Sequence, residues 1–507
     1  MTLSVFYGAV INPVSLTEYK VFPRCLLVIG PEGTIICMVK DVASHLLQDT
    51  LAQEGLVDID IYALRDGEFI IPGFIDTHTH APQFPITATG QEFELLKWLE
   101  DIVFPMEKKF ANLDFASRTY KIVVRRSIDL GTTTSCYYGS LHYEATRELA
   151  DIVHAYGQRA FIGKCNMNRV PPTFDDEGRP IEMGTAKPND DYIEPDTQRS
   201  IETTVKLIKH IRSLPPQTTG TGPEPLVKPI LTPRFALSCT DDLLAGLGEL
   251  ALRDPSLNIQ THISENLKEV EDTLKAFPYA CNYADVYNIF KLLRHNTILA
   301  HGVHLTDDEL MLIKEKDAGI SHCPVSNYNL RSGVAQIGKY LDRGIKVGLG
   351  TDVSGGFSPS MLTVIQHAST ASKVLAFRSV LPRVGKDESE PTPPSTTDGG
   401  FADRLLRVAT LFYLATVGGA QVCDIDKHVG SFAVGKSFDA LLVSVRGDTG
   451  NLTIWNGDIG HSEHEKDKPE EFFSRWLERF LFGGDDRNIL RVYVQGRLIG
   501  GKSFHHK

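Results

Sequence analysis

A pair of histidines in one short apolar segment is the strongest chemical signal in the sequence. His78 and His80 belong to the run PGFIDTHTH, which begins at Pro72. In a β-strand, residues i and i+2 project to the same face, so both imidazole rings would point in one direction. Two neutral imidazoles side by side suit a zinc-like ion, which binds nitrogen at about 2.0–2.1 Å. Taken alone, the pair leaves two interpretations open: a metal site, or two unrelated histidines.

Polar residues at the ends of three later candidate strands favour the metal. His262 lies in THISEN with Glu265 three residues on, His301 lies in LAHGVHL, and Asp352 lies in GLGTDVSG. In a TIM barrel, catalysis is built at the C-terminal ends of the strands. A buried structural histidine explains any one of these positions, but not a coincidence at four strand ends. His304 is off the strand alternation, and we give it no more than a minor role.

The elements that would position these residues form a regular series from Phe69 onward. Short apolar segments alternate with amphipathic ones, such as Phe115–Leu130, Glu144–Tyr156 and Asp307–Lys316, which is typical of parallel βα units. The eight candidate strands are Phe74–His80, Thr132–Tyr138, Ala160–Asn166, Leu226–Pro233, Asn258–Ile263, Thr297–Val303, Ala318–Pro324 and Lys346–Asp352. Eight such units predict an α/β fold with a closed (β/α)8 TIM-like barrel.

Further β-like runs lie outside this series at both chain ends. They are Val5–Ile11, Cys25–Ile29 and Thr34–Val39 before the barrel, and Asp439–Val445, Thr453–Trp455 and Leu490–Val494 after it, with Gln495-Gly496 as a hairpin turn. We expect residues 1–72 and 426–507 to form one small β-sandwich domain beside a barrel of residues 73–425. Pro171–Pro195 and the polar, Pro-rich Lys386–Gly400 read as surface insertions.

Composition excludes several classes of protein. With 52 Lys and Arg against 64 Asp and Glu, the 507-residue chain has a net charge of −12, which argues against a nucleic-acid-binding surface. No run approaches the ~20 apolar residues of a membrane span. The start, MTLSVFYGAVINP, has no signal-peptide pattern, and the eight cysteines form no CxxC pair. We therefore expect a cytoplasmic protein with free thiols.

One familiar motif is rejected on its context. Residues 430–437, GSFAVGKS, match the GxxxxGK[ST] pattern of a phosphate-binding loop. Such a loop needs a helix after it, because the helix N-terminus helps to bind the phosphate. The residues that follow, Phe438–Val445, read as a strand instead. We therefore exclude binding of a nucleoside triphosphate at this segment.

Together the segments PGFIDTHTHA, THISEN, LAHGVHL and GLGTDVSG resemble the amidohydrolase superfamily over nearly the whole chain, in particular its mononuclear nucleobase and nucleoside deaminases. Within that group the sequence is most similar to the guanine deaminases. The discriminating segments are HAPQ from His80, Trp98-Leu99 followed by Phe104-Pro105, PRFALSC from Pro233 and HISEN from His262.

The resemblance implies a set of site residues. It implies one Zn²⁺ per chain bound by His78, His80, His262 and Asp352. Family members with two metals usually bridge the two ions with a lysine at the end of strand four. This chain has Thr232-Pro233-Arg234-Phe235 at that position, which favours a single metal. Lys164, on strand three, is expected to serve packing or to be a surface charge rather than a bridge. A bound zinc can lower the pKa of water to about 7. The implied catalytic residues are Glu265 as proton shuttle, Asp352 and His301, and the implied substrate contacts are Gln83, Trp98, Leu99, Arg234, Phe235, His262, Glu265 and Asp352.

The activity implied is the hydrolytic deamination of guanine to xanthine and ammonia, within purine catabolism or salvage. Guanine and water would be the small-molecule partners, and the family suggests a homodimer. Two alternatives remain at this stage. One is a related aminohydrolase acting on adenosine-like, triazine or oxidised purine substrates, and the other is a catalytically silent scaffold of the same fold.

Overall fold

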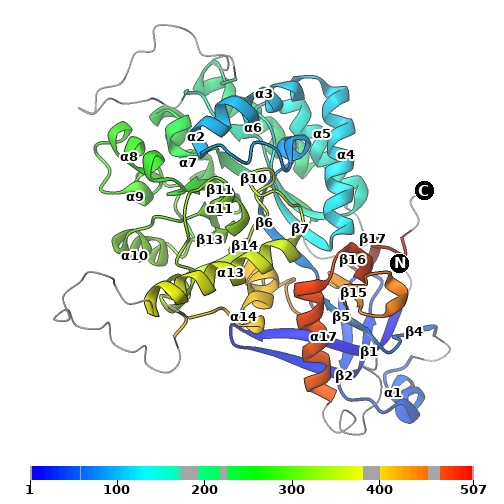
Figure 1. The fold of residues 1–507 in the computed structure, drawn as a ribbon. Helices are drawn as coiled ribbons and strands as arrows, with labels where there is room; N and C mark the ends of the chain where they lie inside the picture. Colours follow the sequence, from blue (N-terminus) through cyan, green and yellow to red (C-terminus); the bar gives the residue numbers. More distant parts are fainter. Residues whose placement is uncertain are drawn as a thin grey trace.

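In the computed structural model, the eight predicted barrel strands form one parallel sheet around which the helices are arranged (Figure 1). The structure describes residues 3–56, 59–170, 172, 192–216, 225–380, 400–402, 404–454 and 469–504. The insertion predicted at Lys386–Gly400 lies outside the described residues except for Gly400. The one predicted at Pro171–Pro195 is described only at residue 172 and from Tyr192 onward.

The barrel strands pair in chain order, each with the next. They are β6 (Phe74–His80), β7 (Thr132–Tyr138), β8 (Arg159–Gly163), β10 (Val227–Pro233), β11 (Asn258–Ile263), β12 (Thr297–His301), β13 (Gly319–His322) and β14 (Lys346–Leu349), with β9 (Cys165–Asn166) as an extra strand on β10. Every predicted strand of this series is confirmed. β12, β13 and β14 end two or three residues earlier than expected, because the chain turns there into the loops of the site.

Hydrogen bonds at one end of the barrel connect its first strand to the segment after its last. The backbone N–H of Asp352 donates to the carbonyl of His78 at 2.8 Å, and the N–H of His80 donates to the carbonyl of Val353 at 3.0 Å. The Asp76 carboxylate adds a third link, accepting from the N–H of Thr351 at 2.9 Å. These contacts fix the end of β14 against the strand that carries the HxH pair.

Helices of the βα units cover the outside of the barrel, with apolar side chains packed toward the strands. The barrel helices are α4 (Leu113–Asp129), α5 (Tyr143–Tyr156), α6 (Thr197–Arg212), α7 (Asp241–Arg253), α8 (Leu267–Ala276), α9 (Tyr283–Ile289), α10 (Asp307–Glu315), α11 (Pro324–Asn329), α12 (Ile337–Asp342) and α13 (Met361–Val380). The three predicted helices correspond to α4, α5 and α10. Two short helices, α2 (Leu95–Trp98) and α3 (Phe104–Glu107), lie in the chain between β6 and α4.

Both chain ends contribute to a second sheet, drawn in blue and in orange to red beside the barrel in Figure 1. Its order is β17 (Arg497–Gly500), β16 (Ile489–Val494), β15 (Ala440–Ser444), β5 (Glu68–Pro72), β1 (Ser4–Ser15), β2 (Glu18–Ile29) and β3 (Ile35–Val39), with β4 (Ile61–Ala63) on β1. The two halves join where β15 pairs antiparallel with β5. Its helical neighbours are α1 (Leu47–Gln53), α14 (Val408–Tyr413) and α17 (Pro469–Gly483), whereas α15 (Gly419–Val422) packs against the barrel strands β14, β13 and β6.

A single residue, Gly73, separates the small sheet from the barrel, since β5 ends at Pro72 and β6 begins at Phe74. A Cβ atom at this position would lie 2.2 Å from the side chain of Thr133 on β7, so only glycine lets the chain pass so close to β7. The first metal-site strand is thereby anchored directly to the small sheet.

Two predicted features of the C-terminal segment had different outcomes. Gln495 and Gly496 form the expected hairpin turn between β16 and β17, with φ of 49° and 71°, as a type I′ turn requires. The strand predicted at Thr453–Trp455 is wrong in its described part, where Thr453 and Ile454 lie outside the strands. There the Asn451 side-chain oxygen accepts the N–H of Thr453 at 2.9 Å and turns the chain instead.

Candidate active site

The four predicted metal ligands come together at the C-terminal end of the barrel. His78 and His80 extend from β6, His262 from β11, and Asp352 follows β14. One donor atom from each residue lies within 4.8 Å of the other three. The two Nε2 atoms of His80 and His262 are 3.1 Å apart, and Asp352 Oδ1 is 3.1 Å from His78 Nε2. The barrel therefore directs three imidazoles and one carboxylate at a single point.

The chemistry of this cluster fits a divalent metal. Burial lowers the pKa of His78, and lowers those of His80 and His262 well below the usual value, so all three rings are neutral at neutral pH. His78 Nδ1 is buried without a hydrogen-bond partner, and its Nε2 has Asp352 Oδ1 as a polar neighbour at 3.1 Å. A buried nitrogen without a partner costs free energy. A metal ion would bind the lone pairs that converge at this point.

A backbone contact fixes which nitrogen of His262 faces the cluster. Its Nδ1 lies 2.5 Å from the carbonyl oxygen of Arg234, which can only accept, so Nδ1 carries the proton. Nε2 is then unprotonated, and its lone pair faces His80. An outer hydrogen bond of this kind commonly orients a metal-binding histidine.

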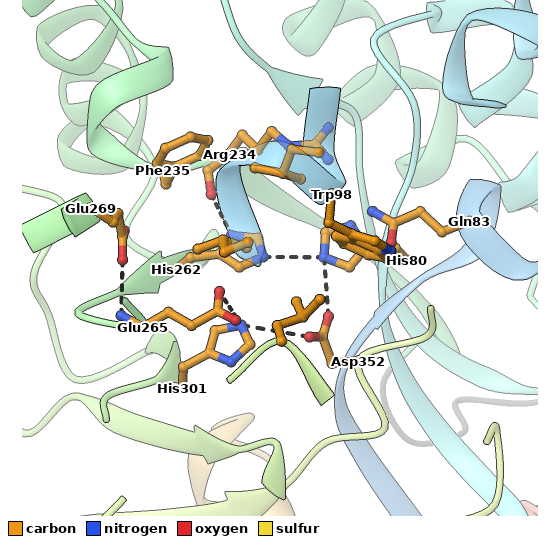
Figure 2. Close-up of a pocket in the computed structure, with 13 residues that line it drawn as sticks. His80, Gln83, Trp98, Arg234, Phe235, His262, Glu265, Glu269, His301 and Asp352 are labelled. Atoms are coloured by element: carbon orange, nitrogen blue, oxygen red, sulfur yellow. Dashed lines mark hydrogen bonds and ion pairs between the residues drawn. The ribbon is translucent and has the colours of Figure 1, made fainter. Parts of the chain in front are cut away.

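Glu265 and His301 lie beside the cluster, at the lower edge of the pocket in Figure 2. Glu265 Oε2 is 3.4 Å from His301 Nε2, and Glu265 Oε1 accepts from the Ser332 hydroxyl at 3.2 Å. Burial raises the pKa of Glu265 to about 7, so this carboxyl can exchange a proton near neutral pH. His301 Nδ1 lies 2.9 Å from the side-chain oxygen of Asn327, which leaves Nε2 toward the pocket.

Three residues at these strand ends have left-handed backbone conformations that side chains rarely adopt. The φ angles are 48° for Ser264, 71° for His301 and 45° for Asp352. Each such residue costs on the order of 1–3 kcal/mol and persists only where the surrounding structure holds it. At His301 and Asp352 the left-handed backbone conformation helps to direct the side chain into the pocket.

The opposite wall of the pocket carries the predicted substrate contacts. Gln83 lies in the short helix Ala81–Ile86 after β6, Trp98 ends α2, Leu99 follows it, and Arg234 and Phe235 follow β10. The pocket has an empty volume of about 410 Å³, its open mouth included. It is lined by His80, Gln83, Leu95, Trp98, Leu99, Arg234, Phe235, His262, Glu265, Glu269, His301, Leu330 and Asp352 (Figure 2). Of the residues predicted for the site, His78 alone is absent from this lining, because it lies beneath it.

Polar groups that the sequence did not point to hold the predicted residues in place. Glu107 accepts from Arg234 and Gln83, and Glu269 accepts the backbone N–H of Glu265 at 2.9 Å. Asn327 and Ser332 contact His301 and Glu265 as described above. None of these four lies at a strand end or in a short repeated spacing, so no pattern in the sequence marks them.

Two other residues weighed on the sequence lie outside the cluster. His304 follows β12, as its broken alternation indicates, and its Nε2 is 2.7 Å from the carbonyl of Ser332. Lys164, expected as packing or a surface charge, is fully buried and its Nζ lies 2.5 Å from Glu194 Oε1. It therefore serves an internal ion pair.

Comparison with known proteins gives the same assignment over almost the whole chain. A profile of the amidohydrolase family matches residues 69–499. The chain is 41% identical to a probable guanine deaminase of Schizosaccharomyces pombe, covering 99% of this chain and 84% of the relative. It is 34% identical to guanine deaminase of Homo sapiens, covering 98% and 96%.

A solved structure extends the likeness to three dimensions. The crystal structure of guanine deaminase from C. acetobutylicum, with guanine bound in its active site, has a TM-score of 0.77 and 30% identity to this chain. The match covers 98% of this chain and 99% of that one. The chain thus belongs to the amidohydrolase family, and the three relatives named here are guanine deaminases or, in one case, a probable one.

Proposed function

We propose that the chain is a guanine deaminase, which hydrolyses guanine to xanthine and ammonia. The observation that carries this proposal is one pocket with two unlike ends. A His/His/His/Asp donor set with a buried carboxyl lies at one end, and an arginine, a glutamine and aromatic rings lie at the other. The first end can activate water, and the second can recognise a flat polar base. The relatives that match the full chain support guanine as that base.

The metal in this proposal is one Zn²⁺ per chain, bound by His78, His80, His262 and Asp352. A tetrahedral site with nitrogen and oxygen ligands is typical of zinc. Zinc in such a site supplies a Lewis acid that brings the pKa of water to about 7, which makes a nucleophile available at neutral pH.

Glu265 moves the protons of the reaction. Its carboxylate takes a proton from the attacking water and delivers it to the purine ring nitrogen. It then takes the proton of the hydroxyl group now on C2 and delivers it to the departing amino group, which leaves a carbonyl at C2. A bond from the water oxygen to C2 forms, and the bond from C2 to nitrogen breaks, releasing ammonia. The pKa of Glu265, raised by burial to about 7, suits a group that must both accept and release a proton.

His301 and Asp352 stabilise the water and the tetrahedral carbon during this step. His301 Nε2 lies 3.7 Å from Asp352 Oδ2, so both polar groups border the space in which the water would sit. Asp352 has a second oxygen beyond the one nearest His78, and it can accept a hydrogen bond from the water.

Arg234 and Gln83 recognise the polar edge of guanine, and Phe235, Trp98 and Leu99 contact its faces. A guanidinium donates only, so it suits the carbonyl oxygen of guanine and disfavours the amino group that adenine has at that position. His262, Glu265 and Asp352 would touch the base on the side of its C2 amino group.

Three wider features belong to the same proposal. The domains are residues 1–72 and 426–507 for the small β domain and 73–425 for the barrel. The enzyme is cytoplasmic, which fits the eight cysteines being thiols rather than disulfides. It is a homodimer, as the family resemblance suggests.

No helix in the described part of the chain combines the length and apolar character that a membrane span requires. Limited proteolysis, cell fractionation and light scattering test these three features in turn.

Ammonia release from a panel of bases tests the activity. The metal-loaded protein is assayed with guanine, adenine, adenosine, an oxidised purine and an aminotriazine. We expect kcat/KM for guanine to exceed that for every other compound. Faster turnover of adenosine or of a triazine than of guanine would overturn the assignment. Metal analysis of the same preparation is expected to give one zinc per chain.

A further inference from the structure

Glu107 is a buried carboxylate just outside the pocket to which the proposed reaction gives no role. It ends α3 and has no exposed surface. Its two oxygens pair with the guanidinium of Arg234: Nη1 donates to Oε2 at 2.7 Å, and Nη2 donates to Oε1 at 3.1 Å. Gln83 Nε2 donates to Oε1 at 2.9 Å, and the Tyr192 hydroxyl donates to Oε2 at 2.7 Å. We call the side of the pocket formed by Gln83, Trp98, Leu99, Arg234 and Phe235 the recognition wall. Glu107 therefore binds both polar side chains of this wall, Arg234 and Gln83, from outside the pocket.

The pair determines the charge that this wall presents to a ligand. Burial acts to lower the pKa of Arg234, but the Glu107 charge and hydrogen bonds raise it overall, so the arginine stays a cation. Lys164, another buried cation, has its own partner in Glu194. The guanidinium also lies over the ring of Phe104, 5.1 Å from its centre. Glu107 is thus the group that cancels the Arg234 charge.

The pair also fixes which way the donors point. It uses two of the five N–H donors of the guanidinium. Nη1 also donates to Cys165 Sγ at 3.9 Å, and the remaining donors are left for a ligand. Gln83 is oriented in the same way, since its amide nitrogen faces Glu107 while its oxygen accepts the backbone N–H of Ser354 at 3.2 Å. Both residues are therefore held before a base arrives, which reduces the ordering cost of binding.

We propose that Glu107 is a specificity-determining positioning residue that makes the recognition wall electrically neutral, so that the pocket prefers a neutral purine base to an acidic one. This inference rests on the proposed function. Its consequence concerns the product: xanthine gives up a ring proton far more readily than guanine, and its anion would find no uncompensated positive charge at Arg234. The neutral substrate is favoured, and the acidic product is released.

The other charged and titratable groups that border the pocket do not replace this pair. They are the proposed metal ligands His80, His262 and Asp352 together with Glu265, Glu269 and His301, and they lie at the other end of the pocket. None of them hydrogen-bonds to Glu107, whose side-chain partners in the described part of the chain are Arg234, Gln83 and Tyr192, so a variant at Glu107 acts first on the recognition wall.

The central experiment compares Glu107→Gln with Tyr192→Phe in the metal-loaded enzyme. The amide keeps the shape but removes the negative charge and places an N–H₂ group among donors. Tyr192→Phe removes one hydrogen bond to Glu107 and keeps its charge. KM and kcat for guanine and the inhibition constant of xanthine are measured at two pH values, one on each side of the first ionisation of xanthine.

For Glu107→Gln we expect KM for guanine to rise about tenfold or more, the size of a lost hydrogen bond to a charged group. We expect the xanthine anion to inhibit this variant at least about tenfold more tightly than it inhibits the wild type, because Arg234 is then unpaired. Tyr192→Phe should change both values by less than about threefold. Unchanged KM and unchanged inhibition in Glu107→Gln would overturn the proposal.

The wild-type enzyme alone gives a second test that does not depend on the variant folding. If the pocket prefers the neutral base, inhibition by xanthine weakens as the pH rises through its ionisation. Tighter inhibition by the anion would overturn the inference. Should the enzyme turn over no guanine, calorimetric binding of guanine and of xanthine to the metal-loaded protein still decides the preference, so that this inference and the proposed function can fail separately.

Discussion

The two ends of the pocket are built by different means. At the metal end the side chains project from strands, and the barrel itself sets their separations, as with His78 and His80 on β6. At the recognition end the side chains come from short helices and loops, and a buried carboxylate holds them together. Strand geometry is rigid and tolerant of changes elsewhere, whereas a hydrogen-bonded cluster depends on each of its members. In our proposal the chemistry therefore depends on the barrel fold, and the choice of substrate depends on a local hydrogen-bond network.

Loss of a metal ligand should give the largest effect. His262→Ala removes one of four donors from a site whose ligands come from three separate strand ends. We expect most of the bound zinc to be lost and kcat/KM for guanine to fall by at least about 10⁴-fold, since the nucleophile depends on the metal. Metal analysis and turnover measure this together. Full activity without metal would show that the donor set has another purpose.

Glu265→Gln should separate proton transfer from metal binding. The amide cannot accept a proton, so we expect kcat to fall by about 10²–10⁴-fold with the metal retained. Glu269→Gln is the matched control. Glu269 accepts from the backbone N–H groups of Glu265 and Asn266 and from the Tyr283 hydroxyl, so it has a structural role and its loss should cost much less. Equal losses in the two variants would contradict the assignment of the shuttle.

The pH profile should have an acidic limb set by Glu265. Its pKa is raised by burial to about 7, and the reaction needs the carboxylate to accept a proton. Because the protonated form dominates below that pKa, kcat/KM should fall about tenfold for each further pH unit of acidification. A bound cation would move this limb to lower pH. In Glu265→Gln the limb should disappear, and its persistence there would assign it to another group.

At the recognition end, Arg234→Ala should raise KM more than it lowers kcat. It removes the donors proposed for the guanine carbonyl and leaves Glu107 buried without its cation. We expect KM to rise about 10–100-fold, in line with the loss of hydrogen bonds to a charged group. Steady-state kinetics with guanine measure the split. An unaltered KM would remove Arg234 from substrate recognition.

Ser332→Ala should have the smallest effect of the series. The hydroxyl donates to Glu265 Oε1 at 3.2 Å, a long contact that orients the carboxylate without taking part in the chemistry. We expect kcat to fall by about three- to tenfold with KM little changed, the size of one ordinary hydrogen bond. A loss as large as that of Glu265→Gln would mean that the serine itself transfers a proton.

The comparison of the two ends also explains what the sequence could reveal. The strands, their order and the HxH pair follow from alternation and spacing, and the structure agrees with them to within two or three residues. Arg234 and Gln83 could be named through the family resemblance alone. Glu107 could not be found at all, because its importance depends on a fold that places α3 behind β10. Strand propensity also could not exclude a strand at Thr453. The chain turns there because the Asn451 side-chain oxygen accepts the backbone N–H of Thr453.

Arg234 contacts both ends of the pocket with different parts of itself. Its side chain belongs to the recognition wall, while its carbonyl oxygen orients His262. Every amino acid has a carbonyl oxygen, so any replacement at this position that keeps the backbone path also keeps the metal ligand oriented. Natural selection can therefore try new side chains here without first losing the hydrolytic machinery. The side chain of Arg234 is also the buried partner of Glu107, so divergence toward other aminated rings needs a paired change at Glu107.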